Sequence, residues 1–300
     1  MATFFLSEDD DPIDIRIDGV FKAVFAKGTP ESTKALSKLV SALIGRELSI
    51  ISILTNEPPI DNIRDRQIRF DINCKAENGE LVDVEMCLNP DVSEPVRLEF
   101  YTAKLFGGQD IRGVDKDYGD LKRTYQIAIL GNTQLFSDDS YYHTFFYYDP
   151  IRGISLDGRT QIITLELSKL KEIVEKPIGQ MTASERWAVF LEYLTRRDKR
   201  DKINMIVEYE EGIAMASQVL MNVSKDEIER ARLLSEYKYQ MDMQSKLVTA
   251  KKEGKLEEKL ERDKEELENA RNALAKGYPL ETIHDITGLD IETLKNLTPR

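Results

Sequence analysis

The chain has 300 residues, of which 32% are charged and 41% hydrophobic, and its formal net charge at pH 7 is −12. A chain of this length can bury a substantial core, as one large domain or two smaller ones. The acidic balance excludes a protein that coats nucleic acid by charge alone, since such domains are strongly basic. Any contact with nucleic acid must therefore be local.

The termini and the two cysteines indicate a cytoplasmic protein with no membrane partner. No apolar stretch approaches the roughly 20 residues that span a bilayer. The apolar run at residues 1–6 is too short for a signal peptide and leads into the acidic residues 8–11. Cys74 and Cys87 fall on opposite faces of neighbouring predicted strands, so we expect no disulfide, as in a reducing compartment.

Two helices and a strand are predicted before the first proline-rich break. Apolar residues at 20, 21, 24 and 25 mark one face of a helix over residues 18–25. Thr29 is typical of a helix N-cap and Pro30 of a first helical position, in a helix that runs to about residue 47. The nearly continuous apolar segment 48–54 predicts a strand.

Residues 68–88 alternate between apolar and polar on both sides of an Asn-Gly pair, the pattern of a β-hairpin with one buried face. A two-residue Asn-Gly turn mixes the two faces. A three-residue loop ending at Gly79 keeps apolar residues opposite apolar residues and puts glycine at the left-handed position. In that register Ile72 faces Val84.

The same register sets Asp71 directly opposite Glu85, with Asp83 on the same face. Opposed like charges destabilise a sheet unless something compensates them. The three carboxylates form either a polar face washed by solvent or a site for a hard divalent cation. The residues alone leave both interpretations open.

Downstream, a break at Asn89-Pro90 precedes a predicted helix over residues 96–107. Further strands are predicted over residues 123–130, 141–148 and 161–167. The period then becomes helical, with helices predicted over residues 182–195, 198–207 and 208–221. These elements predict a mixed α/β (α+β) fold.

The segment 225–270 carries 13 acidic and 11 basic residues. It is either a single solvated helix or a short coiled coil. The approximate heptad seam consists of Leu256, Leu260, Leu267, Ala270 and Leu274. Two short helices follow around Thr287-Gly288, and the second offers only Lys295 as a cation, which favours packing or homodimerisation over reading DNA.

Other chemistry finds little support in the sequence. The two histidines, His143 and His284, are far apart and neither lies near a nucleophile motif. There is no phosphate-cradling glycine loop, zinc spacing or dinucleotide fingerprint. The acidic hairpin remains as the candidate site.

Several short motifs recur in an order that resembles one family. They are Asp18 with Phe21-Lys22 and Phe25, then Phe70-Asp71-Ile72, Asn78-Gly79 and Val84-Glu85-Met86, then Arg97 with Tyr101, Tyr118, residues 165–169 and residues 286–289. The order and spacing are similar to those of the Rpn family (recombination-promoting nuclease / putative transposase) in the PD-(D/E)XK nuclease superfamily. The resemblance covers most of the chain.

The resemblance implies a PD-(D/E)XK restriction-endonuclease-like core, built of a helix, three strands, a helix and a strand, with a helical C-terminal extension. It implies a metal-dependent DNA endonuclease linked to recombination, mobile elements or defence. By this resemblance Asp71 and Glu85 would be catalytic ligands of Mg²⁺ or Mn²⁺, and Asp18 would supply a further acid to the metal.

One position departs from the family. Cys87 stands where the family usually has Gln, and a thiol is a weak donor and a soft ligand. Arg69 lies opposite Cys87 in the derived register and offers a replacement cation. The alternative is a catalytically degenerate relative that acts as a nucleic-acid-binding or protein-interaction module.

Phosphate contacts require basic side chains near the hairpin. Arg97 and Lys104 are seven residues apart and share one face of the predicted helix, which makes them candidates together with Arg69. We expect a nuclease-like domain at residues 1–175, a helical subdomain at 176–224 and a charged tail at 225–300.

Overall fold

The computed structural model describes residues 6–7, 9–54, 70–111 and 116–297. Contacts between residues divide the chain into two compact units, residues 1–237 and 238–300. The candidate cation Arg69 lies outside the described residues.

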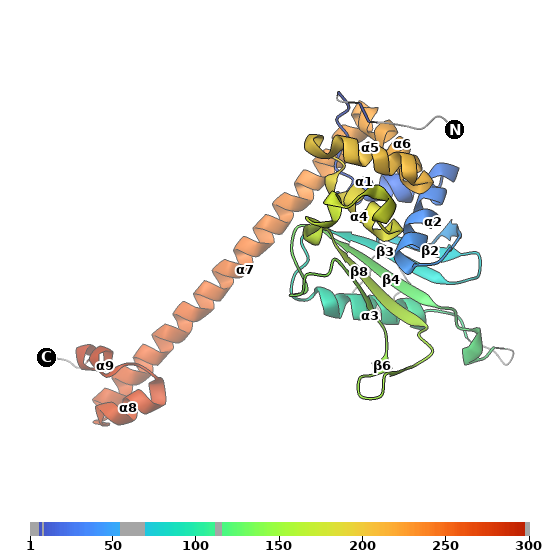
Figure 1. Cartoon of the computed structure of the whole chain (residues 1–300). Coiled ribbons are helices and arrows are strands. Elements are labelled where there is room, and N and C mark those ends of the chain that lie inside the picture. The colour runs from blue at the N-terminus through green and yellow to red at the C-terminus, as the bar shows by residue number, and fades with distance from the viewer. Residues whose placement is uncertain (1–5, 8, 55–69, 112–115, 298–300) are drawn as a thin grey trace. The chain divides into compact units, whose positions relative to one another are not determined.

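A six-stranded mixed sheet forms the centre of the first unit (Figure 1). Its strands, in spatial order, are β1 (Ile50–Ile53), β2 (Ile72–Ala76), β3 (Leu81–Cys87), β4 (Thr124–Leu130), β8 (Thr160–Glu166) and β5 (Tyr142–Phe145). β3, β4 and β8 run parallel, and antiparallel pairs flank them. The parallel step from β3 to β4 needs a crossover, which contains helix α3 (Glu94–Gly107).

The β2–β3 hairpin has the register that the sequence predicts. Ile72 pairs with Val84, and the pairing continues without a shift to Lys75 and Leu81. Gly79 has φ of +85°, a left-handed conformation that glycine adopts without the steric cost of a side chain. The three-residue loop therefore fixes which side chains share the polar face.

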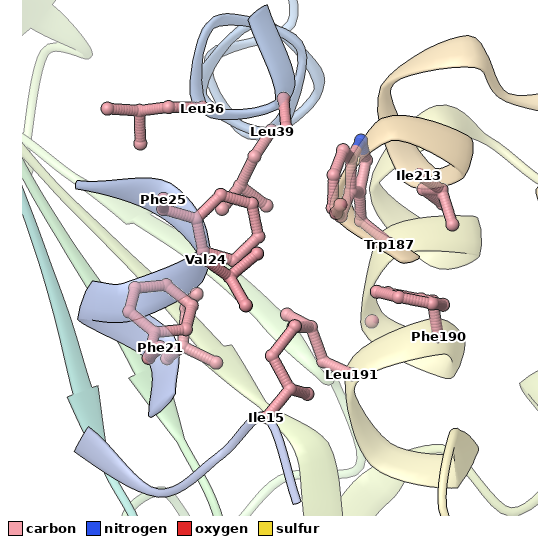
Figure 2. Packing of buried hydrophobic residues seen from close by; sticks show 14 of the residues in the cluster. Ile15, Phe21, Val24, Phe25, Leu36, Leu39, Trp187, Phe190, Leu191 and Ile213 are labelled. Carbon is pink, nitrogen blue, oxygen red and sulfur yellow. The ribbon is translucent and has the colours of Figure 1, made fainter. Parts of the chain in front are cut away.

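Helices cover the apolar face of the sheet. They are α1 (Asp18–Phe25), α2 (Pro30–Ile44) and α4 (Ala183–Tyr193), and α5 (Arg200–Tyr209) and α6 (Glu211–Lys225) pack on these helices. Trp187 is 1% exposed, and its ring lies 5.9 Å from Phe25 and 6.0 Å from Phe190. Figure 2 shows these rings between α1 and α4, with Leu39 of α2 beside them. This core fixes α1 against the sheet.

The local chemistry of α2 confirms its predicted start. The side chain of Thr29 accepts a hydrogen bond from the Ser32 amide at 3.2 Å, and Pro30 occupies the first helical position. The helix ends at Ile44, earlier than predicted, because Gly45 takes a left-handed conformation with φ of +79°.

Helix α3 packs on the opposite face of the sheet through Leu98, which contacts Ala128 and Leu130. The predicted mixed α/β fold, with a six-stranded sheet between helices, is confirmed. The polar residues of β3 and β4 on this face are buried, including Asp83 and Gln126, which are both 0% exposed.

The predicted strand at residues 141–148 is interrupted. β5 ends at Phe145, and the chain leaves the sheet to form a small two-stranded ribbon of β6 (Tyr148–Asp149) and β7 (Ile154–Ser155). The Asp149 carboxylate accepts hydrogen bonds from the amides of Ile151 and Arg152 and closes this turn. The described part of the unit also contains five short 3₁₀ helices: η1 (Tyr118–Asp120), η2 (Leu167–Lys169), η3 (Ile173–Glu175), η4 (Ile178–Gln180) and η5 (Arg197–Lys199).

The charged segment forms one helix, α7 (Glu227–Ala275), followed by α8 (Leu280–Thr287) and α9 (Ile291–Leu297). Within the second unit Ala270 is fully buried against Ile283 and Leu294, so this part of the predicted seam covers the two short helices. Leu256 and Leu260 are 59% and 50% exposed. None of the helices in the described ranges has the length and apolar character needed to cross a membrane.

Candidate metal centre

The carboxylates of the hairpin meet at the polar face. Asp71 precedes β2, and its Oδ2 accepts a hydrogen bond from the Met86 amide at 3.2 Å, which holds it beside the strand that carries Glu85. Asp83 and Glu85 are 0% and 2% exposed. A solvent-washed face is therefore excluded for these two residues, and their charges must be compensated by something other than bulk water.

Helix α1 brings a lysine to this group. Lys22 Nζ lies 2.8 Å from Asp18 Oδ1 and 2.9 Å from Asp71 Oδ1. Burial lowers the pKa of Lys22, but Asp71 and Asp18 together raise it above its usual value. Asp18, predicted as a further metal ligand, is thus joined to Asp71 through an ammonium group. The i, i+4 spacing of Asp18 and Lys22 was the available signal for this pair.

A second cation holds Glu85. Arg97 Nη2 lies 2.8 Å from Glu85 Oε2 and 2.8 Å from Glu94 Oε1, and its guanidinium stands 5.5 Å from the centroid of the Tyr101 ring. Arg97 thus contacts a candidate ligand directly, although its side chain keeps 40% exposure. Lys104 is exposed farther along α3, with Nζ 5.8 Å from the Phe100 ring centroid, and does not join the cluster.

A buried glutamine supports Asp83 from the next strand. Gln126 lies opposite Asp83 in the β3–β4 ladder, and its Nε2 donates to Asp83 Oδ2 at 2.6 Å. Gln126 is the one amide side chain in β4, whose other residues are apolar or carry a hydroxyl group. This exception in a buried strand is the signal that could have identified Gln126 from the sequence. The polar pair fixes the orientation of one carboxylate oxygen and leaves the other available.

Two buried carboxylate oxygens of the hairpin, Asp83 Oδ1 and Glu85 Oε1, accept no hydrogen bond from the described residues. Burial, only partly offset by Arg97, raises the pKa of Glu85 to about 8. Burial and the neighbouring Glu85 raise the pKa of Asp83 well above its usual range. Burial and Asp18 also raise the pKa of Asp71. Burial is the largest cause of all three shifts, and a bound cation would offset it by favouring the charged carboxylates.

The donor set fits a hard divalent cation. Acidic groups outnumber basic ones in the cluster, with five carboxyls (Asp18, Asp71, Asp83, Glu85 and Glu94) and two described cations (Lys22 and Arg97). Oxygen ligands are those that Mg²⁺ and Mn²⁺ prefer. The unpartnered oxygens of Asp83 and Glu85 supply an independent reason to expect an ion here.

Cys87 contributes no charge to this group. Its Sγ lies 3.9 Å from Glu94 Oε2, and burial together with Glu94 raises the pKa of the thiol to about 12. Cys87 is therefore a neutral thiol at pH 7, and no disulfide joins it to Cys74, as predicted. A neutral thiol neither balances a carboxylate nor suits a hard cation.

A second group of ligand-type side chains lies at the β8–β5 edge of the sheet. Ligand atoms of Asp138, His143 and Glu166 lie within 4.8 Å of one another, close enough to hold a metal ion. His143 Nε2 is 2.8 Å from Asp138 Oδ2. The ammonium of Lys169, whose side chain is 3% exposed, contacts both Asp138 and Glu166. Lys169 and the Leu135 and Phe136 amides already contact these carboxylates. Asp83 and Glu85 instead each keep an oxygen that accepts no hydrogen bond from the described residues, so the hairpin cluster is the better candidate for a divalent ion.

A mixed sheet that carries an acidic hairpin between two layers of helices has the organisation of a PD-(D/E)XK nuclease core. The model of the PD-(D/E)XK nuclease family transposases matches residues 15–250, which is most of the chain. The chain belongs to this family. No curated protein and no solved structure matches it.

Proposed function

We propose that this chain is a divalent-metal-dependent DNA endonuclease of the Rpn / putative transposase type, linked to recombination, mobile elements or defence. The observation that carries the proposal is the pair of buried carboxyl groups, Asp83 and Glu85, each with an unpartnered oxygen beside Asp71. Family membership supports the same reaction class.

In this proposal Asp71 and Glu85 hold Mg²⁺ or Mn²⁺, and Asp83 adds negative charge behind them. When bound, the ion supplies Lewis-acid polarisation of a phosphodiester and lowers the pKa of a water molecule. A water oxygen bonds to phosphorus as the bond from phosphorus to the departing sugar oxygen breaks. That oxygen leaves with the proton that water gives up.

The chain's own residues orient the site. Arg97 fixes one oxygen of Glu85, and Gln126 fixes one oxygen of Asp83, so that the free oxygen of each carboxyl is set before substrate arrives. Such preorganisation lowers the cost of gathering charged groups at the reacting phosphate. The exposed part of Arg97, together with Lys104 and Arg69, is proposed to contact the DNA backbone.

Cys87 favours a second candidate function, a degenerate relative that binds nucleic acid or another protein without cleaving it. Its thiol is neutral and turned towards Glu94, so it gives no polar support to an attacking water. Cleavage by the purified protein separates the two candidates.

The experiment is cleavage of supercoiled plasmid with Mg²⁺ or Mn²⁺. Wild-type protein is compared with Asp71→Asn and Glu85→Gln, which keep side-chain size. Glu77→Gln, at the exposed tip of the same hairpin, is the matched control. We expect nicking by the wild type and the control and at least a 100-fold loss in the two site variants. An inactive wild type with either metal would favour the degenerate relative, and active site variants would move the site elsewhere.

A further inference from the structure

The hairpin lacks a cation at the position two residues after Glu85. Phosphodiester hydrolysis builds negative charge on the phosphoryl oxygens, and a fixed positive group nearby stabilises that charge. Cys87 cannot supply it, because a thiol carries no positive charge in either protonation state. Among the described residues, such a cation must come from another element of the fold.

Two described cations contact the carboxylates of the candidate centre, Lys22 on the Asp71 side and Arg97 on the Glu85 side. Arg97 is held by two carboxylates and lies over the Tyr101 ring, so its planar group is fixed in place. These contacts let Arg97 orient the Glu85 carboxylate, but they do not leave its guanidinium free to move towards a substrate.

Lys22 has the freedom that Arg97 lacks. Its ammonium sits on a flexible stem and carries three rotatable donors, whereas the planar guanidinium of Arg97 also lies over the Tyr101 ring. A divalent ion on Asp71 would repel the ammonium from that carboxylate. Asp18, one helical turn before Lys22, would keep it at the site, with Nζ 2.8 Å from Asp18 Oδ1.

We propose that Lys22 of α1 is the catalytic cation of this centre, contacting the scissile phosphate in place of the missing side chain at position 87. Asp18 is then a positioning residue for Lys22 rather than a metal ligand. This inference rests on the proposed nuclease function. It places the catalytic cation on a helix that is distant in sequence from the hairpin.

Packing in the core supports this assignment. Phe21 and Phe25 of α1 are both 0% exposed and anchor the helix in the core. Asp18 and Lys22 therefore emerge on the edge of α1 that meets Asp71, and this edge cannot rotate without unpacking the two rings. A cation held by a rigid element has the preorganisation that catalysis requires.

The test compares single-turnover plasmid cleavage by Lys22→Met, Lys22→Arg and the control Lys34→Met. The control removes a surface lysine of α2 that forms an ion pair with Glu211. Lys22→Met is expected to lose at least 100-fold in rate and Lys22→Arg less than 10-fold, while Lys34→Met is unchanged. In the Lys22→Met background, Cys87→Lys is expected to recover at least 10-fold.

Mn²⁺ affinity, measured by calorimetry without DNA, is the second readout. Lys22→Met is expected to bind Mn²⁺ at least as tightly as the wild type, because a cation that competes for Asp71 is removed. A parallel loss of Mn²⁺ binding and cleavage would make Lys22 a structural residue and overturn the inference. If the wild type cleaves DNA and Lys22→Met is equally active, the role of Lys22 is overturned while the nuclease function stands. An inactive wild type overturns both.

Discussion

The buried carboxyl of Glu85 makes the stability of the metal-free protein depend on pH. Its pKa rises from 4.5 to about 8 in the fold, mainly through burial. Between these two values the folded state holds a proton that the unfolded chain has lost. Stability from this group is therefore complete below pH 4.5 and is lost as the pH rises towards 8.

The size of the effect follows from the pKa shift. One pKa unit corresponds to about 1.4 kcal/mol, so the shift of Glu85 corresponds to at most about 5 kcal/mol across the whole window. Coupling to Asp83 spreads the titration over both groups. We expect a change of about 2–5 kcal/mol between pH 5 and pH 8.5.

The assay is urea unfolding in EDTA across this pH range, for wild type, Glu85→Gln and the exposed control Glu77→Gln. The Gln side chain of Glu85→Gln cannot ionise. The free energy of unfolding of this variant, relative to that of the wild type, should therefore rise with pH, while that of the control should change with pH as the wild type does. Saturating Mg²⁺ should reduce the loss for the wild type, because the ion stabilises the charged carboxylate. Parallel curves for wild type and Glu85→Gln would refute the reasoning.

Two further predictions concern the core and the second unit. Trp187→Ala should lower the free energy of unfolding by about 3–5 kcal/mol through the cavity it leaves beside Phe25, and a loss below 1 kcal/mol in urea unfolding would contradict the described packing. The exposed Leu256 and Leu260 are proposed to pair with a second copy, so sedimentation should give a dimer for the full chain and a monomer for residues 1–237. A monomeric full chain at micromolar concentration would contradict the homodimer.

The hairpin could be predicted from the sequence because its information is local. Only one register of the hairpin buries a single apolar face and also puts glycine at the left-handed position. The structure has this register, from the Ile72–Val84 pair to the Lys75–Leu81 pair. The same local chemistry predicts α2, where Thr29 and Pro30 define the start. Both elements depend on residues close together in the chain.

The partners of the site residues could not be predicted in this way. Lys22 reaches Asp71 because the rings of α1 pack in the core, and this contact joins segments that no short-range pattern relates. The spacing of Arg97 and Lys104 predicts that they share a helix face. It does not predict that only Arg97 contacts strand β3. Glu85 binds Arg97 and leaves Lys104 in solvent.

The measurement that tests the central claim most directly is calorimetric titration of the metal-free protein with Mn²⁺ at pH 8, beside an Asp71→Asn/Glu85→Gln double variant. The proposed centre predicts one ion bound per chain, with release of protons from Glu85, whose pKa is about 8, and no binding at that site in the double variant. Equal Mn²⁺ binding by the two proteins would contradict it and place the ion elsewhere on the chain.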